Sequence, residues 1–84
     1  MPIPGLTLAN LAPGMQATIT TVDPADSGVV RLMVLGLVEG ASVAFRNTAI
    51  GGDPLEVSVH GTSISVRREQ AQSFGIALES PREH

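Results

Sequence analysis

The chain has 84 residues, of which 43% are hydrophobic, enough for one small domain and too short for a second. Eight acidic and five basic residues give a net charge of −3, and every basic residue is an arginine. This acidic balance and an aromatic content of 2% argue against a nucleic-acid partner. The lack of cysteine excludes disulfides, thiolate metal sites and cysteine nucleophiles.

The hydrophobic segments are too short to cross a membrane. No apolar run approaches the roughly 18 residues of a span. The N-terminal residues have neither the basic flank nor the apolar stretch of a signal peptide. We therefore expect a cytoplasmic protein without direct membrane insertion.

The first part of the chain predicts a turn and then a strand. Thr7 is expected to cap a short turn over residues 8–11, which a proline–glycine pair ends. From Met15 onward, apolar and polar residues alternate through residue 20, a pattern typical of a half-buried strand. Residues 23–28 are expected to form a loop.

One segment breaks this alternation and predicts a helix of about two turns over residues 29–35. It is apolar except for Arg31, and Ser27 can cap its start. Gly36 stands where a left-handed residue ends a helix, and Leu37 follows as its hydrophobic contact.

This predicted helix is apolar on more than one face. At about 100° per residue, its inward face is expected to consist of three residues: Val29, Leu32 and Leu35. Val30 and Val34 then point the opposite way, with Met33 on the flank. Either flanking loops cover this outer face, or it is a surface for protein contact or self-association.

The second half of the chain predicts further short strands. Alternation returns near residues 43–46, 55–60 and 63–67, and a last apolar run covers 74–78. His60-Gly61 predicts a tight turn between two strands, and residues 47–53 predict a loop. A second helical turn is expected to begin near Arg68. The fold class is thus mainly β, with about five strands and one or two short helices. Because open edges are a liability in so short a sheet, we expect a small barrel.

The predicted core follows from the same pattern. We expect the inward residues of the helix and of the strands to be buried: Leu32, Leu35, Val43, Val57, Val59, Ile64, Val66 and Ile76.

The residues that carry chemistry are scattered, so we predict no enzyme, no cofactor and no assigned metal ligand. His60 and His84 are far apart in sequence, and His60 alternates outward. Structural zinc sites usually need four protein ligands. Asp23 and Asp26 either hold a hard cation weakly or form a turn through bonds to the backbone. Arg31 and Arg67 either hold loops in place through hydrogen bonds to carbonyl or carboxylate groups, or contact a protein partner beside the apolar surface.

Four motifs in order make the chain resemble a known family. Residues 31–40 read R-L-x-x-L-G-L-x-x-G, and residues 8–14 read L-x-x-L-x-x-G. Gly52-Asp53-Pro54 precedes a predicted strand, and an R-x-x-Q-A turn at residues 67–71 follows the predicted strand that contains Ile64 and Val66. This arrangement, from about residue 6 to residue 78, resembles the FeoA family, ferrous iron transport protein A.

The resemblance implies a fold and a function. The fold would be a small SH3-like β-barrel, a single domain over 1–84 with its core at 6–78 and flexible ends at 1–5 and 79–84. The function would be that of a non-enzymatic cytoplasmic accessory that docks on a FeoB-type ferrous-iron permease with a GTP-binding domain. The partner-binding residues proposed for this docking come from the helix and from the later arginine: Val30, Arg31, Met33, Val34 and Arg67.

Two alternatives stay open beside this interpretation. One is a sensor or carrier domain that binds a divalent transition metal directly, and the other is a homo-oligomer. Family members are often more basic than this chain and often carry polar residues on the helix surface. The apolar residues found here therefore favour a contact surface that does not depend on positive charge.

Overall fold

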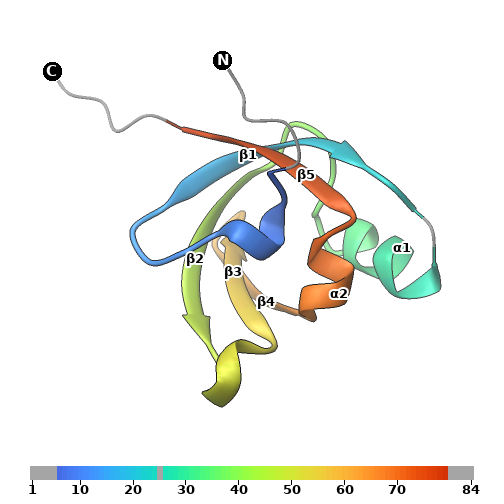
Figure 1. The fold of residues 1–84 in the computed structure, drawn as a ribbon. Coiled ribbons are helices and arrows are strands. Elements are labelled where there is room, and N and C mark those ends of the chain that lie inside the picture. Colours follow the sequence, from blue (N-terminus) through green and yellow to red (C-terminus); the bar gives the residue numbers. More distant parts are fainter. Residues whose placement is uncertain (1–5, 25, 80–84) are drawn as a thin grey trace, which may run out of the picture.

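The computed structural model describes residues 6–24 and 26–79 (Figure 1). The expected number and order of strands and helices are confirmed, including the short helix after the fourth strand. The predicted flexible ends lie outside the described residues, except for Glu79. In chain order the elements are η1 (Leu8–Asn10), β1 (Gln16–Val22), α1 (Ser27–Val34), β2 (Ser42–Thr48), η2 (Ile50–Gly52), β3 (Leu55–Val59), β4 (Thr62–Val66), α2 (Arg68–Ala71) and β5 (Phe74–Leu78).

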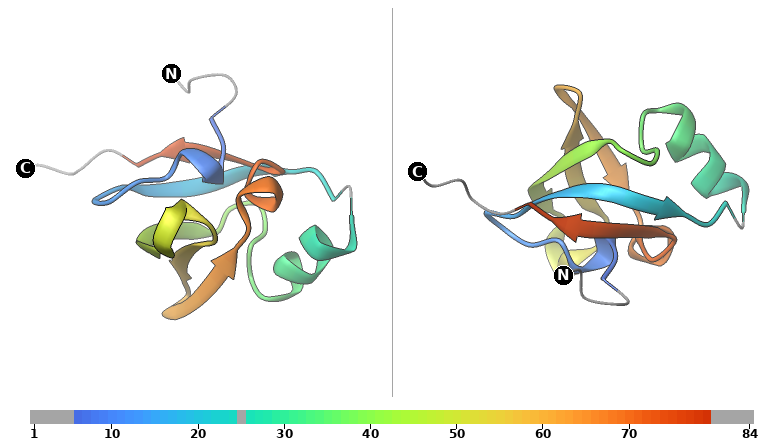
Figure 2. Two further views of the ribbon diagram at one scale, coloured as in Figure 1. Left: turned by 60° about the horizontal axis from the view of Figure 1, so that its bottom comes forward. Right: turned by 90° about the horizontal axis from the view of Figure 1, so that it is seen from above.

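The five strands form one antiparallel sheet in the order β4-β3-β2-β1-β5. The predicted closed barrel is wrong in one respect, because the sheet has two edges, β4 and β5, that do not pair with each other. The helical segments cover the opening instead, since η1, α1 and α2 each place buried residues in the core. Figure 2 shows the sheet curving around this core with both α-helices on the same side.

Two irregularities help to bend the sheet. The register shifts between Ile19 and Thr21 where β1 pairs with β5, and between Phe45 and Asn47 where β2 pairs with β3. Such bulges increase the local twist and bend the strand that carries them. A five-stranded sheet can therefore enclose a core without closing.

The core contains almost every residue expected there, and Leu35 is the exception. Strand residues alternate in burial as predicted, most clearly in β3, where Leu55, Val57 and Val59 are buried. The largest side chains with no exposed surface include Phe74 and Leu8, from the last strand and the first turn. The first turn and the last strand therefore contribute to one hydrophobic cluster.

The reversal between β3 and β4 is confirmed as a two-residue hairpin. Its central residues, His60 and Gly61, have φ values of 52° and 77°. Two positive φ values match a type I′ turn, whose twist suits the flanking strands. The pairing of Val59 with Thr62 closes this turn.

Candidate functional site

Local hydrogen bonds cap both ends of helix α1 and fix its position. The N-cap is Asp26, whose Oδ1 accepts a bond from the Val29 amide at 3.0 Å, so the expected cap Ser27 is instead the first helical residue. At the other end, Gly36 has a φ of +122°. Its amide donates to Met33 and the Leu37 amide donates to Leu32, the bond pattern of a Schellman motif.

The buried face of α1 is narrow. Val29 and Leu32 are buried, and Met33 is half-buried against the core. Leu35, expected to share this face, is 55% exposed. The reason is angular: the middle of the buried arc lies between Val29 and Leu32, and Leu35 stands about 90° from it at 100° per residue. Leu37, beyond the turn, is fully buried.

The outer side of α1 carries exposed apolar side chains. Val30 is 45% exposed and Val34 is 80% exposed, as their predicted orientation requires. Leu35 at the end of the helix and Val38 beyond it are also exposed, and Arg31 is exposed on the same helix. We call Val30, Val34, Leu35 and Val38 the α1 apolar surface.

The position of α1 is set by neighbours at both of its ends. Near Gly28 lies the side chain of Gln70 from α2, and near Gly36 lies the ring of His60 from the β3–β4 turn. The helix therefore lies between α2 and the β3–β4 hairpin, with its outer side turned away from the sheet (Figure 1).

Arg67 does not extend this surface through any hydrogen bond that the described part of the chain contains. It is exposed, and it is the N-cap residue of α2 without a side-chain capping bond. The neighbouring Arg68 side chain instead forms hydrogen bonds to two other segments. Its Nε donates to the Gly52 carbonyl and its Nη1 to the Ala9 carbonyl, both at 2.6 Å. Two adjacent arginines at a strand–helix junction gave no sequence signal as to which would turn inward.

The remaining polar groups form no metal centre within residues 6–24 and 26–79. No three His, Asp or Glu side chains come together there. His60 is exposed at its turn, as expected, while His84 lies outside the described residues. Asp26 caps α1, so the turn interpretation of this acidic residue is confirmed.

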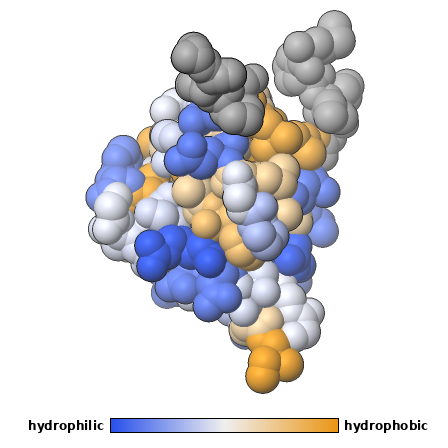
Figure 3. Space-filling view, turned by 90° about the vertical axis from the view of Figure 1, so that its left-hand side faces the viewer, coloured by the Kyte–Doolittle hydropathy of each residue, from blue (hydrophilic) through white to orange (hydrophobic). Residues whose placement is uncertain are grey.

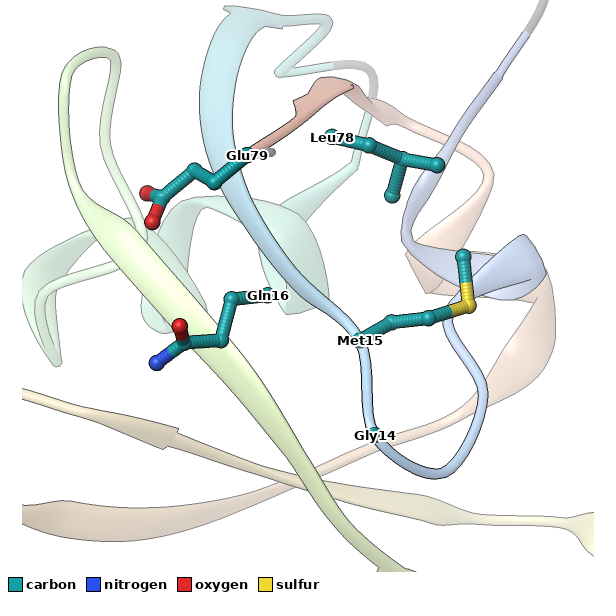
Figure 4. A pocket seen from close by; sticks show the side chains of 5 residues that line it. All are labelled: Gly14, Met15, Gln16, Leu78 and Glu79. Atoms are coloured by element: carbon teal, nitrogen blue, oxygen red, sulfur yellow. The ribbon is translucent and has the colours of Figure 1, made fainter. Parts of the chain in front are cut away.

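A shallow hollow of about 210 Å³ lies where β1 begins and β5 ends. Figure 4 shows the side chains of Met15 and Leu78 on one side of β1, and those of Gln16 and Glu79 on the other. Glu79 Oε2 accepts bonds from the hydroxyls of Thr18 and Ser42, each at 2.9 Å. The polar groups do not converge on the hollow, so it has no evident ligand.

A second exposed apolar position lies far along the chain from α1. Ile50 in η2 has a relative exposure of 102%. Figure 3, which views the face turned left in Figure 1, shows a hydrophobic projection at the bottom, where Figure 1 places η2. A single projecting side chain offers less area than the four residues of the α1 apolar surface. We therefore take the α1 apolar surface as the candidate functional site.

No helix in the described ranges has both the length and the apolar character that crossing a bilayer requires.

Comparison with known proteins identifies the family. A family model described as the FeoA domain matches residues 6–76. None of the curated protein sequences matches this chain significantly. Among solved structures, the iron(II) transport protein A of Clostridium thermocellum has a TM-score of 0.80 at 23% identity, over 87% of this chain and 45% of that one. This chain thus spans less than half the length of that protein.

Two further structures are similar over more of their own length. The FeoA protein of Chlorobium tepidum has a TM-score of 0.82 at 33% identity, over 93% of this chain and 74% of that one. Stenotrophomonas maltophilia FeoA, described as a prokaryotic SH3 domain protein complexed with zinc, has a TM-score of 0.70 at 27% identity, over 88% and 95%. The SH3-like fold expected from the sequence is thus confirmed, with an open sheet. The chain therefore belongs to the FeoA family, which is associated with ferrous iron transport.

Proposed function

We propose that this protein is a non-enzymatic cytoplasmic accessory of ferrous iron uptake that docks on the GTP-binding domain of a FeoB-type permease. The observation that carries the proposal is the α1 apolar surface, with Val34 80% exposed and Leu35 55% exposed on a chain of the FeoA family. Stenotrophomonas maltophilia FeoA is itself proposed as a ferrous iron transport activating factor, which supports the same role here.

The chemistry of the surface indicates what the partner must offer. Apolar side chains at positions 30 and 34 lie one turn apart, the spacing by which a helix anchors in a hydrophobic groove. Burying a valine or leucine side chain fully is worth about 1.5–3 kcal/mol. Arg31 is exposed beside them and can bond an acidic or carbonyl group at the rim. Met33 and Arg67, the other two predicted partner-binding residues, would contribute less from a half-buried flank and from α2.

Docking would change transport by shifting the permease between conformations. A ligand shifts such an equilibrium only if it binds one state more tightly than the other. If the nucleotide bound to the permease also favours one of these conformations, linkage requires that it change the affinity for this protein. We therefore expect binding that differs between nucleotide-free, GDP-bound and GTP-bound partner.

The experiment is a pull-down followed by calorimetric titration against the cytoplasmic part of the permease from the same organism. We expect Val30→Glu/Val34→Glu to weaken binding by at least about tenfold, because two charges would have to be desolvated in an apolar contact. Both side chains are exposed, so circular dichroism should show an intact fold.

The matched control is Ile50→Glu, the same change from an exposed apolar residue to an acid on another part of the surface. It should bind like the wild type. Unchanged binding by Val30→Glu/Val34→Glu, or loss of binding by Ile50→Glu alone, would contradict the assignment to α1. If no permease binding is found but Fe²⁺ or Zn²⁺ binds stoichiometrically and is lost in His60→Ala, direct metal binding replaces the proposal.

A further inference from the structure

Residues 26–39, which contain α1 and lead from β1 to β2, form a segment that we call the strap. Hydrogen bonds tie the backbone to the rest of the fold on both sides of it. The Asp23 amide donates to the turn before β5 at 2.9 Å, and the Gly40 amide donates to the Ile19 carbonyl at 2.8 Å. Within the part of the chain that the structure describes, every hydrogen bond of the strap itself ends inside it or on the adjacent Ala41.

Apolar side chains hold the strap against the rest of the molecule. Val29 and Leu32 of α1, and Leu37 beyond it, are buried in the core. At the two ends of α1, the side chains of Gln70 and His60 lie against glycines of the strap. Because Gln70 follows β4 and His60 precedes it, α1 lies alongside the edge of β4 that faces away from β3 (Figure 2).

The sheet and the strap therefore differ in what stabilises them. The strands share backbone hydrogen bonds with their neighbours across the sheet. The strap depends on a narrow buried face, and its helix has only eight residues. A helix of this length is marginal in water once it leaves its packing surface. Segments with few buried contacts open at a lower free energy than the core of the same protein.

We propose that the strap opens by local unfolding as one unit while the sheet stays folded, and that this opening switches the α1 apolar surface off. In the closed form, Val30 and Val34 lie one turn apart on an ordered helix. In the open form this spacing is lost. A partner that binds only the closed form has an apparent affinity scaled by the fraction of chains that are closed. The switch rests on the proposed function, whereas the opening itself does not.

Amide hydrogen exchange measured by NMR tests the opening without any partner. The amides of Val30, Leu35 and Leu37 all donate to carbonyls nearby in the chain. They should exchange with one common opening free energy, and at least about tenfold faster than the Ile19 and Gly40 amides after correction for intrinsic rates. Leu37 discriminates best, because its side chain is fully buried and burial alone would predict slow exchange with the core.

A single disulfide can lock the strap, since the chain has no cysteine of its own. A Cβ on Gly28 would lie 3.2 Å from Gln70 Cδ. Gly28→Cys/Gln70→Cys therefore brings two sulfurs within bonding reach and removes the Gln70 side chain that fills this space. Oxidation should slow exchange in the strap by at least about tenfold relative to Ile19 and Gly40, and reduction should restore it.

The matched control is a disulfide that holds the sheet but not the strap. Ser58 of β3 lies directly opposite Ser63 of β4. The Cα atoms of such pairs are about 4.5–5.5 Å apart, a distance that a disulfide spans. Oxidised Ser58→Cys/Ser63→Cys should leave strap exchange as fast, relative to Ile19 and Gly40, as in the wild type.

The docking assay then tests the switch. When the cytoplasmic part of the permease is bound, exchange of the Val30, Leu35 and Leu37 amides should slow, because binding favours the closed form. Oxidised Gly28→Cys/Gln70→Cys should bind the permease at least as tightly as its reduced form, since the lock removes only open chains.

Three results would overturn the proposal. The first is a strap whose amides exchange only as slowly as those of Ile19 and Gly40. The second is an oxidised Gly28→Cys/Gln70→Cys variant whose strap exchanges as in the wild type. The third is weaker permease binding by the locked form, which would show that docking uses the open strap. Absence of permease binding in every variant contradicts the proposed function and with it the switch, while exchange reports the opening separately.

Discussion

Leu35 and Leu37 lie on either side of Gly36 and have opposite environments. Leu35 is the C-cap of α1 and is 55% exposed, whereas Leu37 is fully buried. The left-handed turn at Gly36 redirects the chain, and it brings Leu37 rather than Leu35 back onto the core. The expected hydrophobic contact at Leu37 is thus confirmed, and the expected burial of Leu35 is wrong.

This contrast predicts unequal costs for two similar substitutions. Leu37→Ala should lower the free energy of unfolding by about 2–5 kcal/mol, because it leaves a cavity in the core. Leu35→Ala should lower it by about 1 kcal/mol at most, since much of that side chain already contacts water. Urea unfolding of both variants with a common m-value measures the difference. Equal losses would mean that Leu35 also packs inside.

At the scale of elements, α1 depends on its ends because it is short. It has eight residues, and isolated helices of this length are marginal in water. Asp26 satisfies one free amide at its start, and the Gly36 turn satisfies carbonyls at its end. These local bonds orient the α1 apolar surface. A substitution that removes a capping bond should therefore also affect the candidate functional site.

Asp26→Ala is therefore expected to lower the free energy of unfolding by about 0.5–2 kcal/mol. The adjacent Ser27→Ala is the matched control, because Ser27 provides no capping bond and lies inside the helix. Thermal unfolding of the two variants at the same pH separates them. A larger loss for Ser27→Ala than for Asp26→Ala would show that the cap is assigned to the wrong residue.

At the scale of the whole molecule, Arg68 ties together segments that are distant in sequence. Its guanidinium bonds the carbonyls of Ala9 and Gly52, and its backbone amide donates to Asp53 Oδ1 at 3.0 Å. The first of these partners is 59 residues away. One half-buried side chain thus links α2 to η1 and to the end of η2.

Removal of the Arg68 side chain should lower the free energy of unfolding. We expect Arg68→Ala to lower the free energy of unfolding by about 2–4 kcal/mol, since two carbonyls lose a charged donor. Arg68→Lys should recover only part of the loss, because one ammonium cannot reproduce the planar fork. Arg67→Ala is the control and should change stability by about 0.5 kcal/mol or less. Denaturant unfolding compares the three, and similar values for Arg67→Ala and Arg68→Ala would contradict this role.

The sequence by itself determined the local elements, because alternation, caps and turn residues act over a few neighbouring positions. It placed the five strands, the Gly36 and His60-Gly61 turns and the outward orientation of Val30 and Val34, and its motifs indicated the FeoA family. Only the tertiary structure decided which of Arg67 and Arg68 turns inward, that Leu35 stays exposed, and that the sheet remains open between β4 and β5. These outcomes depend on which distant segments lie opposite each residue, and no local pattern encodes that.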